Sequence, residues 1–148
     1  VTIKGSDFLL RTIPAKDLFG LKPVWRGKVK VNVSDPTRTI LDMLSDPQLG
    51  GGIRTVLDML TSYLNSKEKD LDSLIKYAEK LGNGAVFKRL GFILEGVSAT
   101  DEKTLGQCRE RLTKGNSKLD PSLQSDRLIT AWRLWVPKNW AKGKRIDR

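Results

Sequence analysis

The 148-residue sequence predicts an α+β fold, in which a small antiparallel sheet packs against a bundle of about five helices. Short runs rich in β-branched residues open the chain, and amphipathic segments with apolar residues three and four positions apart fill its middle. A β-branched and aromatic run then returns near the end. The length is typical of one domain, so we treat residues 1–148 as a single domain.

Strands are expected at the N-terminal end of the chain. Residues 1–4 and 7–13 are short β-type runs, and Pro14 ends the second of them. A hairpin is expected to turn near Arg26-Gly27. Its second arm, residues 29–33, alternates apolar and polar side chains, which should place three valines on one buried face.

Five helices are expected in the middle of the chain. Their predicted spans are about 36–44, 53–64, 71–81, 85–94 and 101–112. Ser34 or Asp35 can cap the first helix, and Pro36 suits its first turn. Gly91 lies inside the fourth helix and weakens it by about 1 kcal/mol relative to Ala. We therefore expect another element to pack closely against Gly91.

A late strand is expected over residues 129–136, which Pro137 closes. Because a strand that follows a helical middle most economically rejoins an earlier sheet, we expect it beside the N-terminal strands. Trp140 follows, among lysines. An indole in a basic stretch can stack on a base, although packing of the chain end onto the body is its expected use.

The composition excludes several kinds of chemistry. With no His and one Cys, the chain can form no internal disulfide, no Cys/His zinc site and no Ser-His-Asp or Cys-His arrangement. We therefore predict no catalytic residue and no cofactor. No apolar run is long enough to span a bilayer and no signal peptide opens the chain, so we expect a cytoplasmic protein without a membrane partner.

The charge balance points to polyanions. The chain has 27 Lys and Arg against 17 Asp and Glu, and residues 96–148 contain twelve basic and six acidic residues. Such a surface attracts phosphates by counterion release. The candidate nucleic-acid-binding residues are Lys88, Arg89, Lys138, Lys142, Lys144 and Arg145. Lys88 and Arg89 can equally lay their stems over apolar surface, and a solvated surface with a frayed tail also explains the rest.

Two weaker patterns each allow a functional and a structural interpretation. Gly50-Gly51-Gly52 precedes a helix and could present N–H groups to a phosphate, but it lacks the Lys-Ser/Thr of a P-loop, which favours a simple turn. Asp35 and Asp42 lie two helical turns apart and would be the test residues of a carboxylate-dependent, magnesium-using nuclease or transferase. Helix capping and surface charge are their expected roles, and no metal site is predicted.

Three segments, taken in order, resemble one family. They are VNVSDPTRTILDML at 31–44 with the following glycine triplet and Ile53, AVFKRLGFILE at 85–95, and LDP at 119–121 followed by WRLWVP at 132–137. Together they resemble the AbiEi family of antitoxins from bacterial type IV toxin–antitoxin systems, also called abortive infection systems. The matched positions that we interpret as structural are Asp35, Pro36, Thr39, Asp42, Gly51, Gly52 and Gly91.

The resemblance implies a C-terminal antitoxin domain that neutralises a nucleotidyltransferase toxin acting on RNA, without a stable complex, and contributes to autoregulation of its operon. It also implies an N-terminal winged helix-turn-helix that binds promoter DNA. The chain opens at Val1 in a predicted strand, so we expect that domain to lie upstream of this chain. The alternative function is a basic nucleic-acid-binding module that grips DNA or RNA phosphates.

Overall fold

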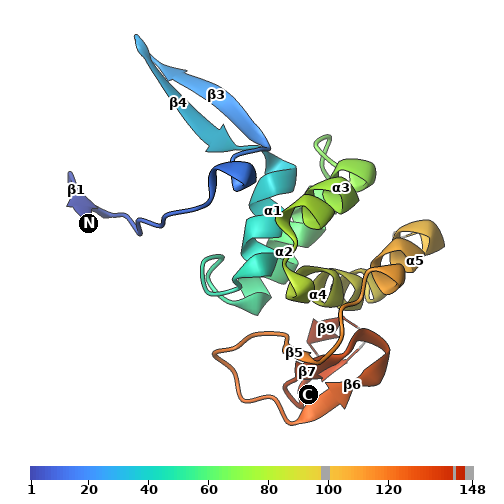
Figure 1. The fold of residues 1–148 in the computed structure, drawn as a ribbon. Coiled ribbons are helices and arrows are strands. Elements are labelled where there is room, and N and C mark those ends of the chain that lie inside the picture. Colours follow the sequence, from blue (N-terminus) through green and yellow to red (C-terminus); the bar gives the residue numbers. More distant parts are fainter. Residues whose placement is uncertain (98–100, 142, 146–148) are drawn as a thin grey trace.

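The computed structural model describes residues 1–97, 101–141 and 143–145. Within them the chain forms helices and small sheets, which confirms the predicted α+β class (Figure 1). The helices are α1 (Pro36–Ser45), α2 (Ile53–Leu64), α3 (Leu71–Leu81), α4 (Gly84–Glu95) and α5 (Glu102–Glu110), with short 3-10 turns η1 (Ala15–Asp17) and η2 (Thr130–Trp132). The strands are β1 (Thr2–Ile3), β2 (Ser6–Asp7), β3 (Leu21–Arg26), β4 (Val29–Ser34), β5 (Ser117–Lys118), β6 (Arg127–Ile129), β7 (Leu134–Val136), β8 (Trp140–Ala141) and β9 (Lys144–Arg145).

The helices begin and end close to the predicted positions because local side chains fix their ends. The carboxylates of Asp35, Asp70 and Asp101 each accept the backbone N–H three residues later, at the start of α1, α3 and α5. Asn83 caps α4 in a similar way, and Gly82 ends α3 in the left-handed conformation. Each such cap stabilises its helix by about 1 kcal/mol.

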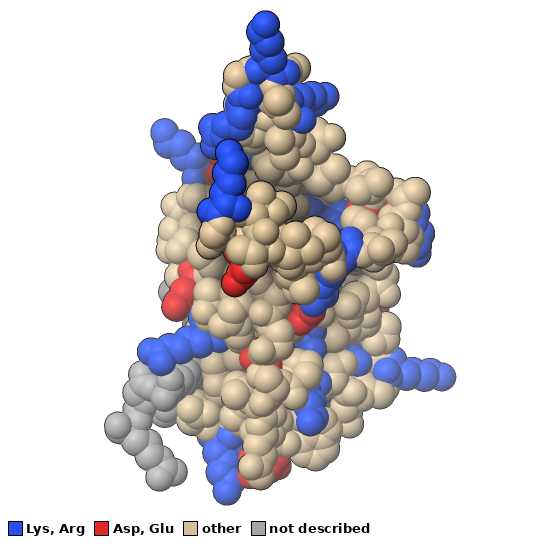
Figure 2. Space-filling model, turned by 90° about the vertical axis from the view of Figure 1, so that its left-hand side faces the viewer, with Lys and Arg blue, Asp and Glu red and all other residues tan. Residues whose placement is uncertain are grey.

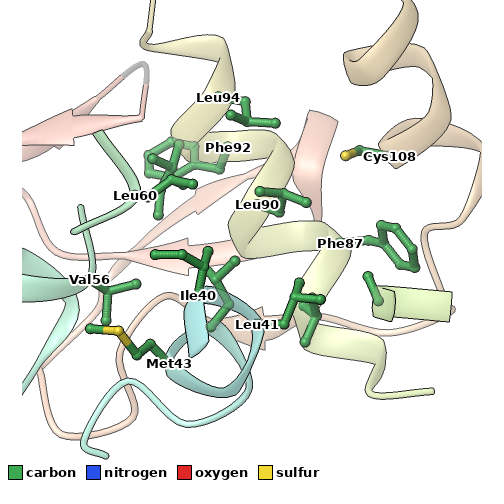
Figure 3. Close-up of a cluster of buried hydrophobic side chains, with 14 of the residues drawn as sticks. Ile40, Leu41, Met43, Val56, Leu60, Phe87, Leu90, Phe92, Leu94 and Cys108 are labelled. Atoms are coloured by element: carbon green, nitrogen blue, oxygen red, sulfur yellow. The ribbon is translucent and has the colours of Figure 1, made fainter. Parts of the chain in front are cut away.

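One hydrophobic core joins the helices to the C-terminal strands, and α4 lies at its centre. Every residue from 86 to 94 is buried, including the charged ones. Figure 3 shows side chains of α4 facing Ile40 and Leu41 of α1 and Leu60 of α2 on one side, with Cys108 of α5 on the other. In the described part of the chain, no helix combines the length and apolar character required to cross a bilayer.

The strands at the two ends of the chain form separate small sheets, and the late strand does not rejoin the early ones as expected. β3 and β4 form a hairpin that stands clear of the helices, whereas β5, β7 and β6 pack beside α4 (Figure 1). The predicted strand over 129–136 is also interrupted. The η2 turn and left-handed Arg133 (φ 52°) reverse the chain, so that β7 pairs antiparallel with β6.

This reversal inserts Trp132 against α4, which confirms the close packing expected at Gly91. Trp132 is fully buried, and a Cβ atom at position 91 would lie only 2.0 Å from its ring. The indole Nε1 donates a hydrogen bond to the Glu95 carboxylate at 3.0 Å. A continuous strand could not place the ring there, because the ring needs both the turn and the missing side chain on the helix.

The hairpin turns at Gly27 as predicted, but its valine face is not buried. The register pairs Val24 with Val31 and Arg26 with Val29, so the valines do share one face. Val29 and Val31 are nevertheless 62% and 46% exposed. The reason is that the hairpin projects beyond the helices (Figure 1), and no described residue covers it.

The segment before the hairpin carries less structure than expected. The predicted strand over 7–13 is limited to Ser6–Asp7, which pair only with β1. Residues 8–14 run extended, and the apolar side chains among them are exposed. Arg11 forms an ion pair with Asp46 at 2.7 Å, which ties this segment to the end of α1.

Candidate nucleic-acid interface

Lys88 and Arg89, two of the predicted phosphate-binding residues, are buried inside the domain. They are 2% and 4% exposed, and burial lowers the pKa of both side chains. Lys88 Nζ donates to the carbonyl of Gly115 at 2.9 Å. The Arg89 guanidinium donates to the carbonyls of Lys118 and Leu44, at 2.8–3.0 Å. These cations therefore join α4 to α1 and β5, and the prediction that they meet phosphates is wrong.

The remaining predicted cations, Lys138, Lys142, Lys144 and Arg145, are described only in part. The side chain of Lys138 is exposed and pairs with Asp126 at 3.4 Å. The backbones of Lys144 and Arg145 form β9, which pairs with β8. Lys142 lies outside the described residues. Trp140, which follows Lys138 closely, is buried in the core, as expected of a residue that packs the end of the chain onto the body.

Asp35 acts as the cap of α1, as expected. One carboxylate oxygen accepts the backbone N–H of Arg38 at 2.7 Å, and the other accepts the Tyr77 hydroxyl at 3.0 Å. Pro36 occupies the first turn, and the Thr39 hydroxyl donates to the Asp35 carbonyl at 2.9 Å. Both carboxylate oxygens of Asp35 are thus engaged within the fold.

The buried side chain of Arg38 fastens the base of the hairpin to α1. Its Nε donates to Asp42 at 2.9 Å, and its Nη1 donates to the carbonyls of Asp17 and Phe19 at 2.5 and 3.0 Å. The guanidinium also lies over the Phe19 ring, 4.4 Å from its centroid. Asp42 therefore balances the charge of Arg38, which is the structural role that we expected for it.

Asp120 occupies the helix end that the glycine triplet would offer to a phosphate. Its carboxylate accepts the backbone N–H of Ile53, the first residue of α2, and the Gln48 amide, both at 3.0 Å. Burial alone would raise the pKa of Asp120, but hydrogen bonds from Ser122 and from these groups outweigh it and hold the pKa below its usual value. Since an internal anion fills the position, the triplet is a turn, with Gly51 and Gly52 at positive φ.

One group of cations without a described partner lies on the hairpin, in a segment that has no acidic residue. Residues 21–34 contain no Asp or Glu. We use the name cationic hairpin for β3, β4 and their turn, with the side chains of Lys22, Arg26, Lys28 and Lys30. None of the four forms an ion pair within the described residues. Figure 2 shows Lys and Arg atoms gathered at the upper end of the molecule, where the hairpin lies.

A charge count made over long stretches of the sequence does not reveal these cations. Residues 1–60 contain nine basic and six acidic residues, an unremarkable balance. The acidic residues lie outside the hairpin, so its 14 residues carry four positive charges and no negative one. A count in windows the length of one hairpin would find this segment, which also contains Trp25 on its first strand.

The structure bears on two further kinds of site, a reactive thiol and a cluster of metal ligands. Burial raises the pKa of the Cys108 thiol to about 12, which keeps it protonated. Within residues 1–97, 101–141 and 143–145, no three His, Cys, Asp or Glu side chains lie together as possible metal ligands. No family model, curated protein or solved structure matches the chain. Its function must therefore be inferred from its own residues.

Proposed function

We propose that the chain is the antitoxin domain of a type IV toxin–antitoxin regulator of the AbiEi kind, and that it binds nucleic-acid phosphates through the cationic hairpin. In this proposal the domain is not an enzyme. It counteracts a nucleotidyltransferase toxin without a stable complex, and phosphate binding is its contribution to autoregulation of the operon. Most of the promoter recognition would belong to a winged-helix domain upstream.

The antitoxin assignment rests on the resemblance, and residues of the matched segments have structural roles in the fold. Each segment supplies buried polar contacts: Arg38 at the base of the hairpin, Arg89 within α4, and Asp120 at the start of α2. Gly91 makes room for Trp132, which comes from the last matched segment. The described contacts of these residues are therefore structural.

The nucleic-acid assignment rests on one observation, the cationic hairpin itself. Four cations and no acidic residue lie on a ribbon that stands clear of the body. Each phosphate that such a side chain neutralises releases counterions, and it contributes about 0.9 to the slope of log affinity against log salt for duplex DNA. Four contacts would give a slope of about 3.6.

Salt titration tests this assignment. We expect fluorescence anisotropy with a labelled duplex to show affinity falling steeply between about 50 and 200 mM salt. Replacement of Lys28 and Lys30 by Gln should lower the slope by about two. The matched control replaces Lys67 and Lys69, two exposed lysines with the same spacing in the loop before α3. An affinity that does not change with salt concentration would contradict the proposal. Equal changes of the slope in the two double variants would also contradict it.

A growth assay tests the antitoxin assignment separately. The chain is co-expressed with the protein encoded by the adjacent gene, which the proposal expects to be a nucleotidyltransferase toxin, and we expect growth to be restored. Trp132→Ala, which empties a fully buried site, serves as the control for loss of fold. Arrested growth in the presence of soluble, folded chain would show that the domain is not the antitoxin.

A further inference from the structure

Trp25 differs from the other three tryptophans because its indole is open to solvent. It is 62% exposed, whereas Trp132 and Trp140 are buried and Trp135 is half-buried. Among the described residues, no aromatic ring or cation is stacked on Trp25. Tryptophan contributes most when its large apolar surface is covered. The exposed indole on a projecting ribbon therefore offers a large apolar surface to a partner from outside the chain.

The strand register places a cation directly beside this indole. Trp25 pairs with Lys30 across the hairpin, so both side chains lie on the same face, with their Cβ atoms about 5 Å apart. Lys22 and Arg26 belong to the opposite face, with the valines, and Lys28 lies in the turn. The Trp25 face thus combines a flat apolar surface with an adjacent positive charge.

This combination matches the chemistry of an unpaired nucleotide. An indole can stack on the open face of a base, and the ammonium group can meet the neighbouring phosphate. In a duplex, the faces of each base are already covered by its stacked neighbours, so an exposed indole finds no equivalent partner there. A protein partner would have to supply several acidic groups to match the hairpin, whereas every nucleotide of a single strand carries its own.

We propose that the cationic hairpin binds single-stranded nucleic acid, with Trp25 stacked on a base and Lys30 at the adjacent phosphate. This inference rests on the nucleic-acid binding of the proposed function and adds the class of ligand. Lys22, Arg26 and Lys28 then provide attraction to the backbone, which any strand shares, while the indole provides the preference for unpaired bases.

The test compares three labelled probes of about 15 nucleotides at one salt concentration: oligouridine RNA, oligothymidine DNA and a mixed-sequence duplex. We expect either single strand to bind at least about tenfold more tightly than the duplex. Trp25→Leu should weaken single-strand binding by about 5- to 150-fold, and the duplex affinity should not change. Single strands should also quench the tryptophan fluorescence of the native protein and not that of the variant.

Val29→Ala is the matched control, because Val29 is as exposed as Trp25 and lies on the opposite face. It should bind each probe as the native protein does. Tighter binding of RNA than of DNA, or of DNA than of RNA, would show which of the two nucleic acids the hairpin prefers. Equal binding would show that the hairpin does not distinguish ribose from deoxyribose. All three results agree with the stacking proposal.

Other results would overturn it. Equal affinity for duplex and single strands, unchanged by Trp25→Leu, would remove the stacking and leave phosphate binding in place. An equal loss for both ligands in Trp25→Leu would assign the indole to a groove contact. Absence of binding to any probe at low salt would remove the nucleic-acid part of the proposed function as well. Capture by anionic phosphatidylglycerol vesicles, but by none of the oligonucleotides, would assign the surface to a membrane.

Discussion

The interior around α4 and the cationic hairpin use the same residue types for opposite purposes. In the interior, Lys88 and Arg89 donate to backbone carbonyls, and Trp132 fills a site made by a glycine. On the hairpin, the cations have no described partner and Trp25 is exposed. The difference lies in the acceptors, because a buried cation needs groups that compensate for lost hydration. The positive charges of the interior are bound to backbone carbonyls of the fold, and those of the hairpin remain available to a ligand.

Arg89→Leu should have the largest effect on stability, and it tests most directly whether the interior cations differ from those of the hairpin. The substitution leaves the buried carbonyls of Lys118 and Leu44 without their donor. We expect the free energy of unfolding to fall by about 3 kcal/mol in urea denaturation. Arg26→Leu, on the hairpin, should change it by less than about 0.5 kcal/mol. Similar losses for the two variants would mean that the two regions do not differ as described.

Gly91→Ala should cost about 2–3 kcal/mol, because the added Cβ overlaps the buried ring of Trp132. Gly106 provides the control, since it lies inside α5 and a Cβ there would meet nothing within 4 Å. Gly106→Ala should raise stability by up to about 1 kcal/mol through helix propensity. Thermal unfolding of both variants measures the two shifts, and shifts of the same sign would argue against the packing at Gly91.

Asp120→Asn should cost about 1–2 kcal/mol at neutral pH, because an amide cannot accept all the hydrogen bonds that the carboxylate accepts. The folded-state pKa of Asp120 lies below the unfolded value, so its contribution is complete above about pH 4 and is lost as pH falls through the folded pKa. The difference between native and variant proteins should therefore shrink in acid. Asp58→Asn, on the exposed face of α2, should change the free energy of unfolding at neutral pH by less than about 0.5 kcal/mol.

The hairpin substitutions should have the smallest effect on folding. Lys28→Gln with Lys30→Gln, and separately Trp25→Leu, should each change the free energy of unfolding by less than about 0.5 kcal/mol. Denaturation of these variants also supports the binding experiments, since it shows that any loss of affinity comes from the surface. A larger loss of stability would place these side chains in contacts that the structure does not contain.

The features predicted correctly are those that neighbouring residues decide. Caps such as Asp35 and Asp70 and the spacing of apolar residues fix the helices locally, and the propensity cost of Gly91 signalled a close contact. Strand pairing and burial depend on distant parts of the chain. Alternation placed Val29 and Val31 on one face, and it could not show that nothing covers that face. Charge alone likewise cannot separate Arg89, which carbonyls surround, from Arg26.

The way in which the hairpin is attached determines how it can move. Asp35 donates its backbone N–H to the carbonyl of Gly20 at 2.7 Å, and Phe19 lies between Arg38 and Lys80. Both strands are therefore fixed where they leave the body, and the six residues of each strand form a lever about 20 Å long. A tilt of about 10° at the pivot would carry the tip through about 3.5 Å. A small adjustment at the pivot thus gives the tip a wide reach while the helices keep their packing.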